Sequence, residues 1–298
     1  MRIYLVFLII LGIHSTGFAQ EGSFCSINQI TFDTNYNYAP RWSPDGKYIA
    51  YTTVTGNTGR IFMRPVDGGD EIYIETGYAG DHHVSWSPDS KQIIFDANPA
   101  KGLENLFLIS IEGGKVNRLT EHKGPNVHPS WSPDGKRVAC ASYRNETTDV
   151  YVIPNTGGDG IRLTHDPATD YHPSWSPDGQ YIVFTSFRTG NADLWLVSSA
   201  GGKPRQLTYH LANDDHARFS PDGSMLAFTS ERSGHRQVWV MYLDGSEFIC
   251  LTPDSSSNAW PDWSPDGAKV AFCSDRSGNL DVYVMDVLEF LPSRTKKE

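Results

Sequence analysis

Histidine recurs along the chain at one position of a repeated motif. Each of these histidines stands three residues before an aromatic residue that opens the sequence aromatic-Ser-Pro-Asp, and the stretch His-Pro-Ser-Trp-Ser-Pro-Asp-Gly occurs twice, 44 residues apart. The set comprises His83, His128, His172 and His216. Neutral imidazole is a ligand for zinc, copper, manganese, iron and nickel. If the fold brings the four rings together, they could hold one divalent transition metal.

The residues two positions before the histidines allow two interpretations. Each is an Asn or Asp, in the series Asn37, Asp81, Asn126, Asp170, Asp214 and Asn258. Their oxygens could accept the second ring N–H of a metal-bound histidine, or could be ligands themselves. Asn and Asp are equally favoured as turn residues before a strand, in which case the histidines would only pack between strands beside water. We favour packing, and the metal site stays open.

Arginine recurs in the same way, just after the second predicted strand of four repeats. The set is Arg144, Arg188, Arg232 and Arg276. Guanidinium groups at a channel opening could bind carboxylates of a ligand or of a partner chain. The alternative is an ion pair within each repeat, for which Asp149, Asp193 and Asp281 are placed at the start of the third strand. We favour the ion pair.

The elements that must position these side chains follow from the spacing of the motif. Its aromatic residue is Trp42, Trp86, Trp131, Trp175, Phe219 or Trp263, at intervals of 44 or 45 residues. Within the fourth unit, β-branched and aromatic runs at 171–175, 181–186, 193–197 and 205–208 are separated by Gly-containing turns. Six units of four short strands predict an all-β protein, a six-bladed β-propeller.

The two ends of the chain indicate how the ring closes. The last unit stops after its third predicted strand, whereas residues 28–31 end in a threonine eleven residues before Trp42. The same spacing separates the threonines of other units from their aromatics. We therefore expect the N-terminal strand to complete the last blade, which removes the open sheet edges.

In a propeller the first strand of each blade lines the central channel, so the four histidines should surround one small volume there. Trp260 occupies the equivalent position in the last blade. Together with Tyr38 and Tyr171 it should lie at the channel entrance, where its ring could stack on a carbohydrate. The repeat tryptophans themselves are expected to be core residues.

The N-terminus and the charge limit the function classes. Residues 1–20 combine Arg2, an apolar run too short to cross a bilayer and a small-x-small site, which predicts a secretory signal peptide. Its removal changes the net charge from −10 to −11, because Arg2 is its one charged residue. We expect no nucleic-acid partner, no membrane span after cleavage, and a monomer that is periplasmic or secreted. Residues 22–290 should form the propeller and residues 291–298 a basic tail.

The repeats resemble a known family. The Trp-Ser-Pro-Asp-Gly units, followed by Thr-Ser-x-Arg-x-Gly and Asp-(Val/Leu)-(Tyr/Trp)-Val, are similar to TolB-type propeller repeats, also called PD40 or WD40-like repeats. TolB has an α/β domain before its propeller, and the chain has few residues there, so the resemblance covers the propeller alone. It implies a scaffold that binds an envelope protein, a peptide or another ligand, without catalysis.

A second function is implied by the oligogalacturonate lyases, which resemble this repeat class and hold a divalent metal with channel histidines. The arginines would suit a small acidic carbohydrate. We find no assignable catalytic base, and no Gly-x-Ser-x-Gly motif of the related peptidases. The sequence therefore favours the scaffold, with the metal-dependent enzyme as the alternative. The partner is not identifiable from the sequence, nor is the pairing of Cys25.

Overall fold

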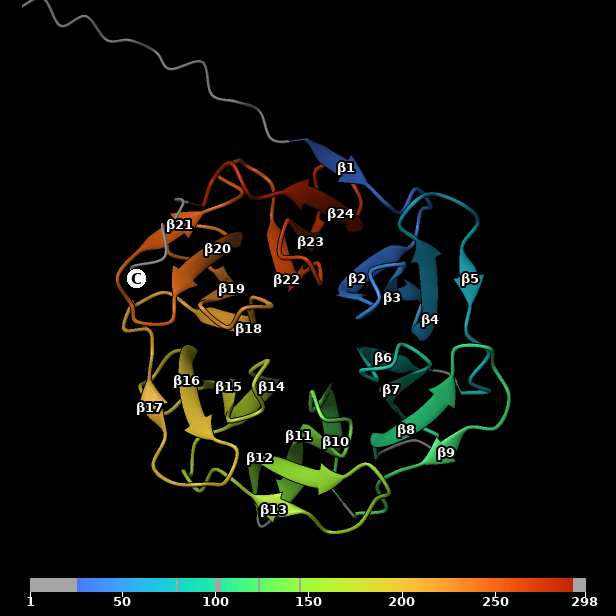
Figure 1. Ribbon diagram of the computed structural model, residues 1–298, viewed down its shortest axis with the longest axis vertical. Coiled ribbons are helices and arrows are strands. Elements are labelled where there is room, and N and C mark those ends of the chain that lie inside the picture. Colours follow the sequence, from blue (N-terminus) through green and yellow to red (C-terminus); the bar gives the residue numbers. More distant parts are fainter. Residues whose placement is uncertain (1–25, 79, 100–102, 123, 145, 292–298) are drawn as a thin grey trace, which may run out of the picture.

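The computed structural model describes residues 26–78, 80–99, 103–122, 124–144 and 146–291. In these residues the chain forms six four-stranded antiparallel sheets, arranged as blades around a central axis (Figure 1). The predicted six-bladed propeller is confirmed. The predicted signal peptide and all of the tail except Leu291 lie outside the described residues.

Each blade runs outward from the axis in four strands. The innermost are β2 (Tyr36–Trp42), β6 (Asp81–Trp86), β10 (Asn126–Trp131), β14 (Asp170–Trp175), β18 (Asp214–Phe219) and β22 (Asn258–Trp263). The second strands are β3 (Tyr48–Thr55), β7 (Gln92–Ala97), β11 (Arg137–Arg144), β15 (Tyr181–Ser186), β19 (Met225–Ser230) and β23 (Lys269–Ser274). The third are β4 (Thr58–Pro65), β8 (Asn105–Ser110), β12 (Thr147–Pro154), β16 (Asp193–Ser198), β20 (Gln237–Tyr242) and β24 (Asp281–Asp286). The outermost are β5 (Ile72–Tyr73), β9 (Asn117–Arg118), β13 (Ile161–Arg162), β17 (Arg205–Gln206), β21 (Phe248–Cys250) and β1 (Ile27–Gln29).

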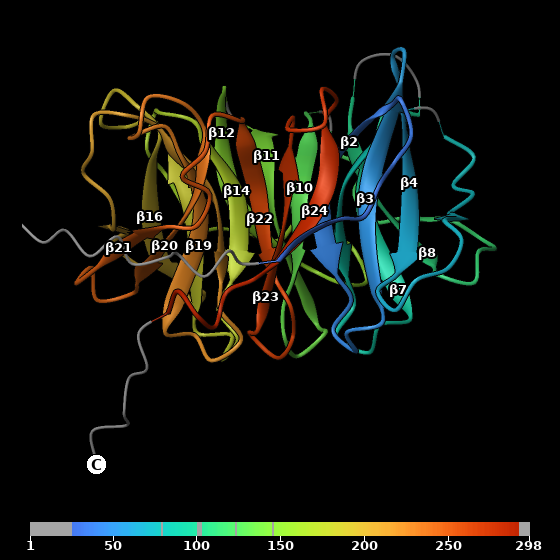
Figure 2. The ribbon, with the colours of Figure 1, turned by 90° about the horizontal axis from the view of Figure 1, so that it is seen from above.

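The strands run between two faces of the ring, which Figure 2 shows edge-on. We call the face at which the innermost strands begin the entry face. The opposite one, where the Ser-Pro-Asp turns join the first and second strands, is the turn face. Each end of the central channel therefore has its own set of residues, fixed by their position along the innermost strand.

The Ser-Pro-Asp turn is held by its own side chains. In the third blade, Ser132 Oγ donates to Asp134 Oδ1 at 2.6 Å and accepts from the amide of Arg137 at 2.9 Å. Asp134 also accepts from the amide of Lys136, and the hydrogen bond from Ser132 lowers the pKa of its carboxyl. Gly135 follows with a φ of +71°, which only glycine adopts without strain. The main role of the motif is therefore to form and stabilise the turn between the first and second strands.

The ring closes through β1, as predicted. This strand pairs antiparallel with β24, with Ile27 opposite Met285. Beyond it, Thr31 Oγ1 donates to Asp281 Oδ1 at 2.8 Å and accepts from the amide of Val282 at 2.9 Å. Thr208 makes the same two bonds to Asp193 and Leu194 in the fourth blade. A threonine stands eleven residues before every repeat aromatic except Trp86, and it is the residue that fastens an outer strand to the third strand.

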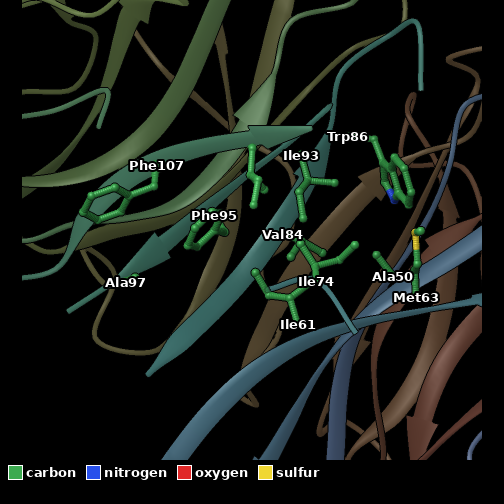
Figure 3. Packing of buried hydrophobic residues seen from close by; sticks show 11 residues of the cluster. Ala50, Ile61, Met63, Ile74, Val84, Trp86, Ile93, Phe95, Ala97 and Phe107 are labelled. Atoms are coloured by element: carbon green, nitrogen blue, oxygen red, sulfur yellow. The ribbon is translucent and has the colours of Figure 1, made fainter. Parts of the chain in front are cut away.

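The core lies between neighbouring blades rather than inside one sheet. Figure 3 shows Ile61 and Met63 of the first blade packed against Trp86, Ile93 and Phe95 of the second. Trp86 is 6% exposed, and its Nε1 donates to the backbone oxygen of the preceding blade's first strand. The repeat tryptophans are core residues, as expected.

Two further sequence features fall within the described residues. Cys140, Cys250 and Cys273 are free thiols, and Cys140 and Cys273 are fully buried. Cys25 is not among the described residues. Over the described ranges, the chain has no helix with the length and apolar character that crossing a membrane requires.

Candidate functional site at the entry face

A bulge in every innermost strand sets the direction of the predicted site residues. The register to the second strand shifts between the residue before the histidine and the residue before the aromatic, for example between Val127 and Ser130. His128 in this bulge has a φ of +53°. Such values are uncommon outside glycine, yet all six blades have them at this position, Ala39 and Trp260 included. The bulge is therefore a property of the fold that re-aims one side chain per blade.

The structure brings the four histidines together around the axis. Their ring centroids are 4.2 Å apart from His83 to His128, 4.2 Å from His128 to His172 and 3.7 Å from His172 to His216. Trp260 Nε1 donates to His216 Nε2 at 2.7 Å. Tyr38 closes the circuit, because its ring contacts those of Trp260 and His83. We call these six residues the aromatic collar.

Most of the collar is electrically neutral at neutral pH. Burial, and after it the neighbouring histidines, lower the pKa values of His128 and His172 well below their ordinary range. Burial has the same effect on the pKa of His216, although 14% of that side chain is accessible. The pKa values are lowered because the rings lie deep in the protein, where water solvates a charged imidazole poorly, even though the rings are not completely enclosed. The collar is therefore an aromatic and weakly polar surface.

The nitrogen atoms of the collar determine whether it suits a metal. The Nδ1 atoms of His128, His172 and His216 are buried and have no hydrogen-bond partner among the described residues. His216 Nδ1 lies 2.7 Å from Asp215 Oδ1, but not in hydrogen-bonding geometry. In the described residues no group of three or more His, Cys, Asp or Glu is arranged to hold a metal ion. Within the described ranges, the unpartnered Nδ1 atoms of His128 and His172 are the feature that suits a metal.

Beside the collar a cavity of about 520 Å³ opens between the second and third blades. Tyr143, which is 45% exposed, forms one wall, and Tyr171 another. The remaining lining residues are His82, His83, Asp96, Glu104, Pro125, Val127, His128 and Thr148. Ligand pockets are commonly of this size and mainly apolar, with a few polar groups. We call it the entry cavity.

Asp96 is a site residue that the sequence analysis missed. It accepts a hydrogen bond from the amide of His128 at 3.1 Å, and its Oδ1 lies 3.2 Å from His83 Nδ1. The equivalent residues in the fourth and fifth blades are Thr185 and Thr229. A single carboxylate at a position otherwise without charge was the signal that could have identified it.

Comparison with known proteins decides the family. The model of the TolB beta propeller domain matches residues 100–217 and 215–295. The chain belongs to this family. The uncharacterized protein Atu1656 of Agrobacterium fabrum is 30% identical over 113 residues, which is 38% of this chain and 38% of that protein. The chain thus matches well under half of the length of that relative.

Solved TolB propellers have the same fold. A candidate TolB from Agrobacterium tumefaciens is 25% identical, with a TM-score of 0.71 over 87% of this chain and 96% of that one. TolB from Acinetobacter baumannii is 22% identical, with a TM-score of 0.65 over 85% and 63%. An oligogalacturonate lyase in complex with manganese is 14% identical, with a TM-score of 0.61 over 88% and 97%. The last two share the fold alone.

In this TolB propeller the predicted arginines lie at the entry face, but their guanidinium groups point into the protein. Arg188 Nη2 contacts both carboxylate oxygens of Asp170 at 3.0 Å, and the guanidinium lies 4.4 Å from the centre of the Trp195 ring. Arg232 repeats this arrangement with Asp214 and Trp239. Each pair links strands of one blade. A role in ligand binding stays a prediction for these arginines.

The other two arginines have different acceptors. Arg276 donates to Asn258 Oδ1 at 2.9 Å and to Asp254 Oδ2 at 3.1 Å, and Arg144 donates to the backbone oxygen of Asp159 at 2.7 Å. The favoured ion pair therefore exists in the fourth and fifth blades, but the predicted partner at the start of the third strand is wrong. That aspartate already holds the threonine of the outer strand, as Asp193 does for Thr208.

Proposed function

We propose that this protein is an exported binding module of the cell envelope, and that its entry cavity binds an extended peptide segment of a partner protein. The observation that carries the proposal is the entry cavity itself: a half-open, largely aromatic hollow of about 520 Å³ beside a neutral collar. The predicted signal peptide supports export, and membership of the TolB propeller family supports a role in the cell envelope.

The chemistry of the cavity indicates which segment it would bind. Tyr143 and Tyr171 offer flat apolar surfaces with a hydroxyl at one edge, which suits aromatic or aliphatic side chains of a peptide. Asp96 and Glu104 are the carboxylates of the lining. A basic residue next to the apolar anchor would therefore be favoured over an acidic one. His128, His172 and His216 add no opposing charge, because their lowered pKa values keep them neutral.

The chain provides a matched pair of positions for the test. Tyr143 in the third blade and Phe187 in the fourth occupy equivalent rim positions, and each is 45% exposed. Only Tyr143 lines the entry cavity. We expect a photo-crosslinking amino acid at position 143, introduced into the full chain in its native cell, to attach to a defined peptide of one partner. The same amino acid at position 187 should give no such product.

Mass spectrometry of the crosslinked peptide supplies the readout. The proposal also requires Tyr143→Asp to weaken binding of a synthetic copy of that peptide by about tenfold or more, since aromatic anchors dominate such interfaces. Phe187→Asp is the control and should leave binding unchanged. Equal crosslinking at both positions, or none at 143, would show that the entry cavity is not a partner site.

A second candidate function is a metal-dependent enzyme that acts on acidic carbohydrates. It is favoured by the unpartnered Nδ1 atoms of His128 and His172, and a distant propeller of this fold, an oligogalacturonate lyase, is known in complex with manganese. His216 does not offer its Nδ1, because its Nε2 accepts from Trp260 and the ring proton of the neutral imidazole is then on Nδ1. When bound, a divalent ion would supply Lewis acidity beside a uronate carboxylate. The Nδ1 atoms of His128 and His172 are the atoms of this chain that would hold it.

Elemental analysis separates the two candidates. The enzyme predicts about one equivalent of a transition metal per purified chain, lost when His128 and His172 are both changed to Ala, together with products of oligogalacturonate that absorb ultraviolet light. The binding module requires neither. Metal that persists in the double variant would point to a site other than the collar.

A further inference from the structure

A second set of residues meets on the axis near the turn face, where no site has been assigned. It consists of the residue immediately before the repeat aromatic in each blade: Arg41, Ser85, Ser130, Ser174, Arg218 and Asp262. All six line one cavity of about 240 Å³. Two arginines and one aspartate give this cavity a net charge of +1. We call it the arginine cavity.

The fold gives this position a structural task that arginine cannot perform. Ser85 Oγ accepts a hydrogen bond from the amide of Trp131 in the next blade at 3.0 Å. Asp262 Oδ2 does the same for the amide of Trp42 at 2.8 Å. A guanidinium group has donors and no acceptor, so Arg41 and Arg218 forgo this link between blades. Packing of the propeller therefore does not explain why arginine stands there.

The positive charge of the cavity is only partly balanced. Arg218 Nε lies 3.8 Å from Asp262 Oδ1, and its Nη1 is 3.5 Å from the backbone oxygen of Pro173. Arg41 is 8% exposed and donates to the backbone oxygen of Pro40 at 2.7 Å. Among the described residues, no carboxylate oxygen lies within 4.0 Å of the Arg41 guanidinium.

A buried guanidinium without a carboxylate partner is costly, and the neighbouring arginine adds repulsion. Burial, followed by the charge of Arg41, lowers the pKa of Arg218 to about 9. Asp262 offsets only part of this charge, because its single negative charge acts on both Arg41 and Arg218. A bound anion would neutralise the remainder.

We propose that the arginine cavity binds a small oxyanion, either phosphate or a carboxylate group, between Arg41 and Arg218. The planar forks of two guanidinium groups match the oxygens of such an anion, and the hydroxyl group of Ser174 lines the same cavity. A volume of about 240 Å³ is large enough for such a group together with water. The site is distinct from the entry cavity and does not depend on its function.

Calorimetric titration of the purified chain with inorganic phosphate, and separately with acetate, tests the proposal at constant ionic strength. We expect saturable binding of about one equivalent of at least one anion. Arg218→Ser should weaken it by about tenfold or more, because a charge-assisted hydrogen bond is lost. Asp262→Ser should tighten it by up to about tenfold, because the competing carboxylate is removed.

Serine is native at this position in three blades, so both variants are compatible with the fold, and near-ultraviolet circular dichroism checks it. Lys47→Ser is the control, since it removes an exposed positive charge on the turn face without reaching the cavity. Binding of phosphate alone or acetate alone identifies the source of the oxyanion. Absence of saturable binding, binding unchanged in Arg218→Ser, or equal loss in Lys47→Ser would overturn the proposal.

Discussion

At pH 8 the Asp81→Asn variant should unfold several degrees above the native protein. Asp81 is fully buried at the start of β6; its Oδ2 accepts from Thr76 Oγ1, and its Oδ1 has no hydrogen-bond partner among the described residues. The second blade has Pro99 where Arg188 stands in the fourth, so it has no guanidinium at this position. Burial, with added repulsion from Asp96, raises the pKa of Asp81 to about 7. Asn at this position is native in three other blades.

The sign of the pH dependence follows from the raised pKa. Between about pH 4 and pH 7 the folded chain keeps a proton on Asp81 that the unfolded chain has released. The native protein therefore loses stability as the pH rises through this window, by up to about 4 kcal/mol at pH 8 for a shift of about three units. Asn does not titrate, so the advantage of Asp81→Asn should be largest at pH 8 and disappear near pH 4.

Thermal unfolding followed by circular dichroism from pH 4 to pH 8 measures this difference. Asp170→Asn makes the same change at the same position of the fourth blade, where Arg188 lies beside the carboxylate. It should give no comparable gain. A gain for Asp81→Asn that is independent of pH would show that packing, and not the buried charge, is responsible.

The propeller could be predicted from the sequence because its turn chemistry is local and repeated. The hydrogen bonds of Ser132 and Asp134 close within five residues, and the same letters recur in all blades. Closure by β1 was predictable for a related reason, since Thr31 must stand at a fixed distance from the next aromatic to reach Asp281. Hydrogen bonds that recur once per blade require the same residues at the same spacing, and this spacing is visible in the sequence.

The candidate site was predictable only in part. Equal positions on equivalent strands brought His83, His128, His172 and His216 together. The burial of His128, His172 and His216, and the lowered pKa values that follow from it, were not predictable, because spacing does not encode depth. The arginine partners were wrong for a related reason. Aspartates recur at the start of both the first and the third strands, and only the structure shows that Thr208 already occupies Asp193.

Residues that depart from the repeat could not be predicted from the features that the units share. Tyr143, Asp96 and Glu104 line the entry cavity in a single pair of blades. Arg41 and Arg218 stand where three other blades have serine. In a propeller the shared residues build the blades, whereas departures from them distinguish one part of the channel from another. Such departures are where specific chemistry should be sought.

Among the substitutions considered, replacing Arg188, the cation of a buried ion pair, should destabilise the protein most. Asp170 is fully buried, and the Nη2 atom of Arg188 contacts both of its oxygens at 3.0 Å. Arg188→Met retains an apolar stem against Trp195 but leaves the carboxylate without a counter-charge. We expect the free energy of unfolding to fall by about 3–5 kcal/mol, as for other buried pairs that lose one partner. Urea unfolding at pH 7 measures the change.

The double variant tests the cause. Combining Arg188→Met with Asp170→Asn should recover most of the lost stability, because an uncharged amide replaces the stranded carboxylate. Asn258 shows that the position accepts Asn, because its Oδ1 accepts from Arg276 and its amide donates to Gln237 Oε1 of the preceding blade. If the double variant were no more stable than Arg188→Met, the lost stability would come from packing against Trp195. The buried aspartates at the start of the innermost strands would then not need the counter-charge of the arginines.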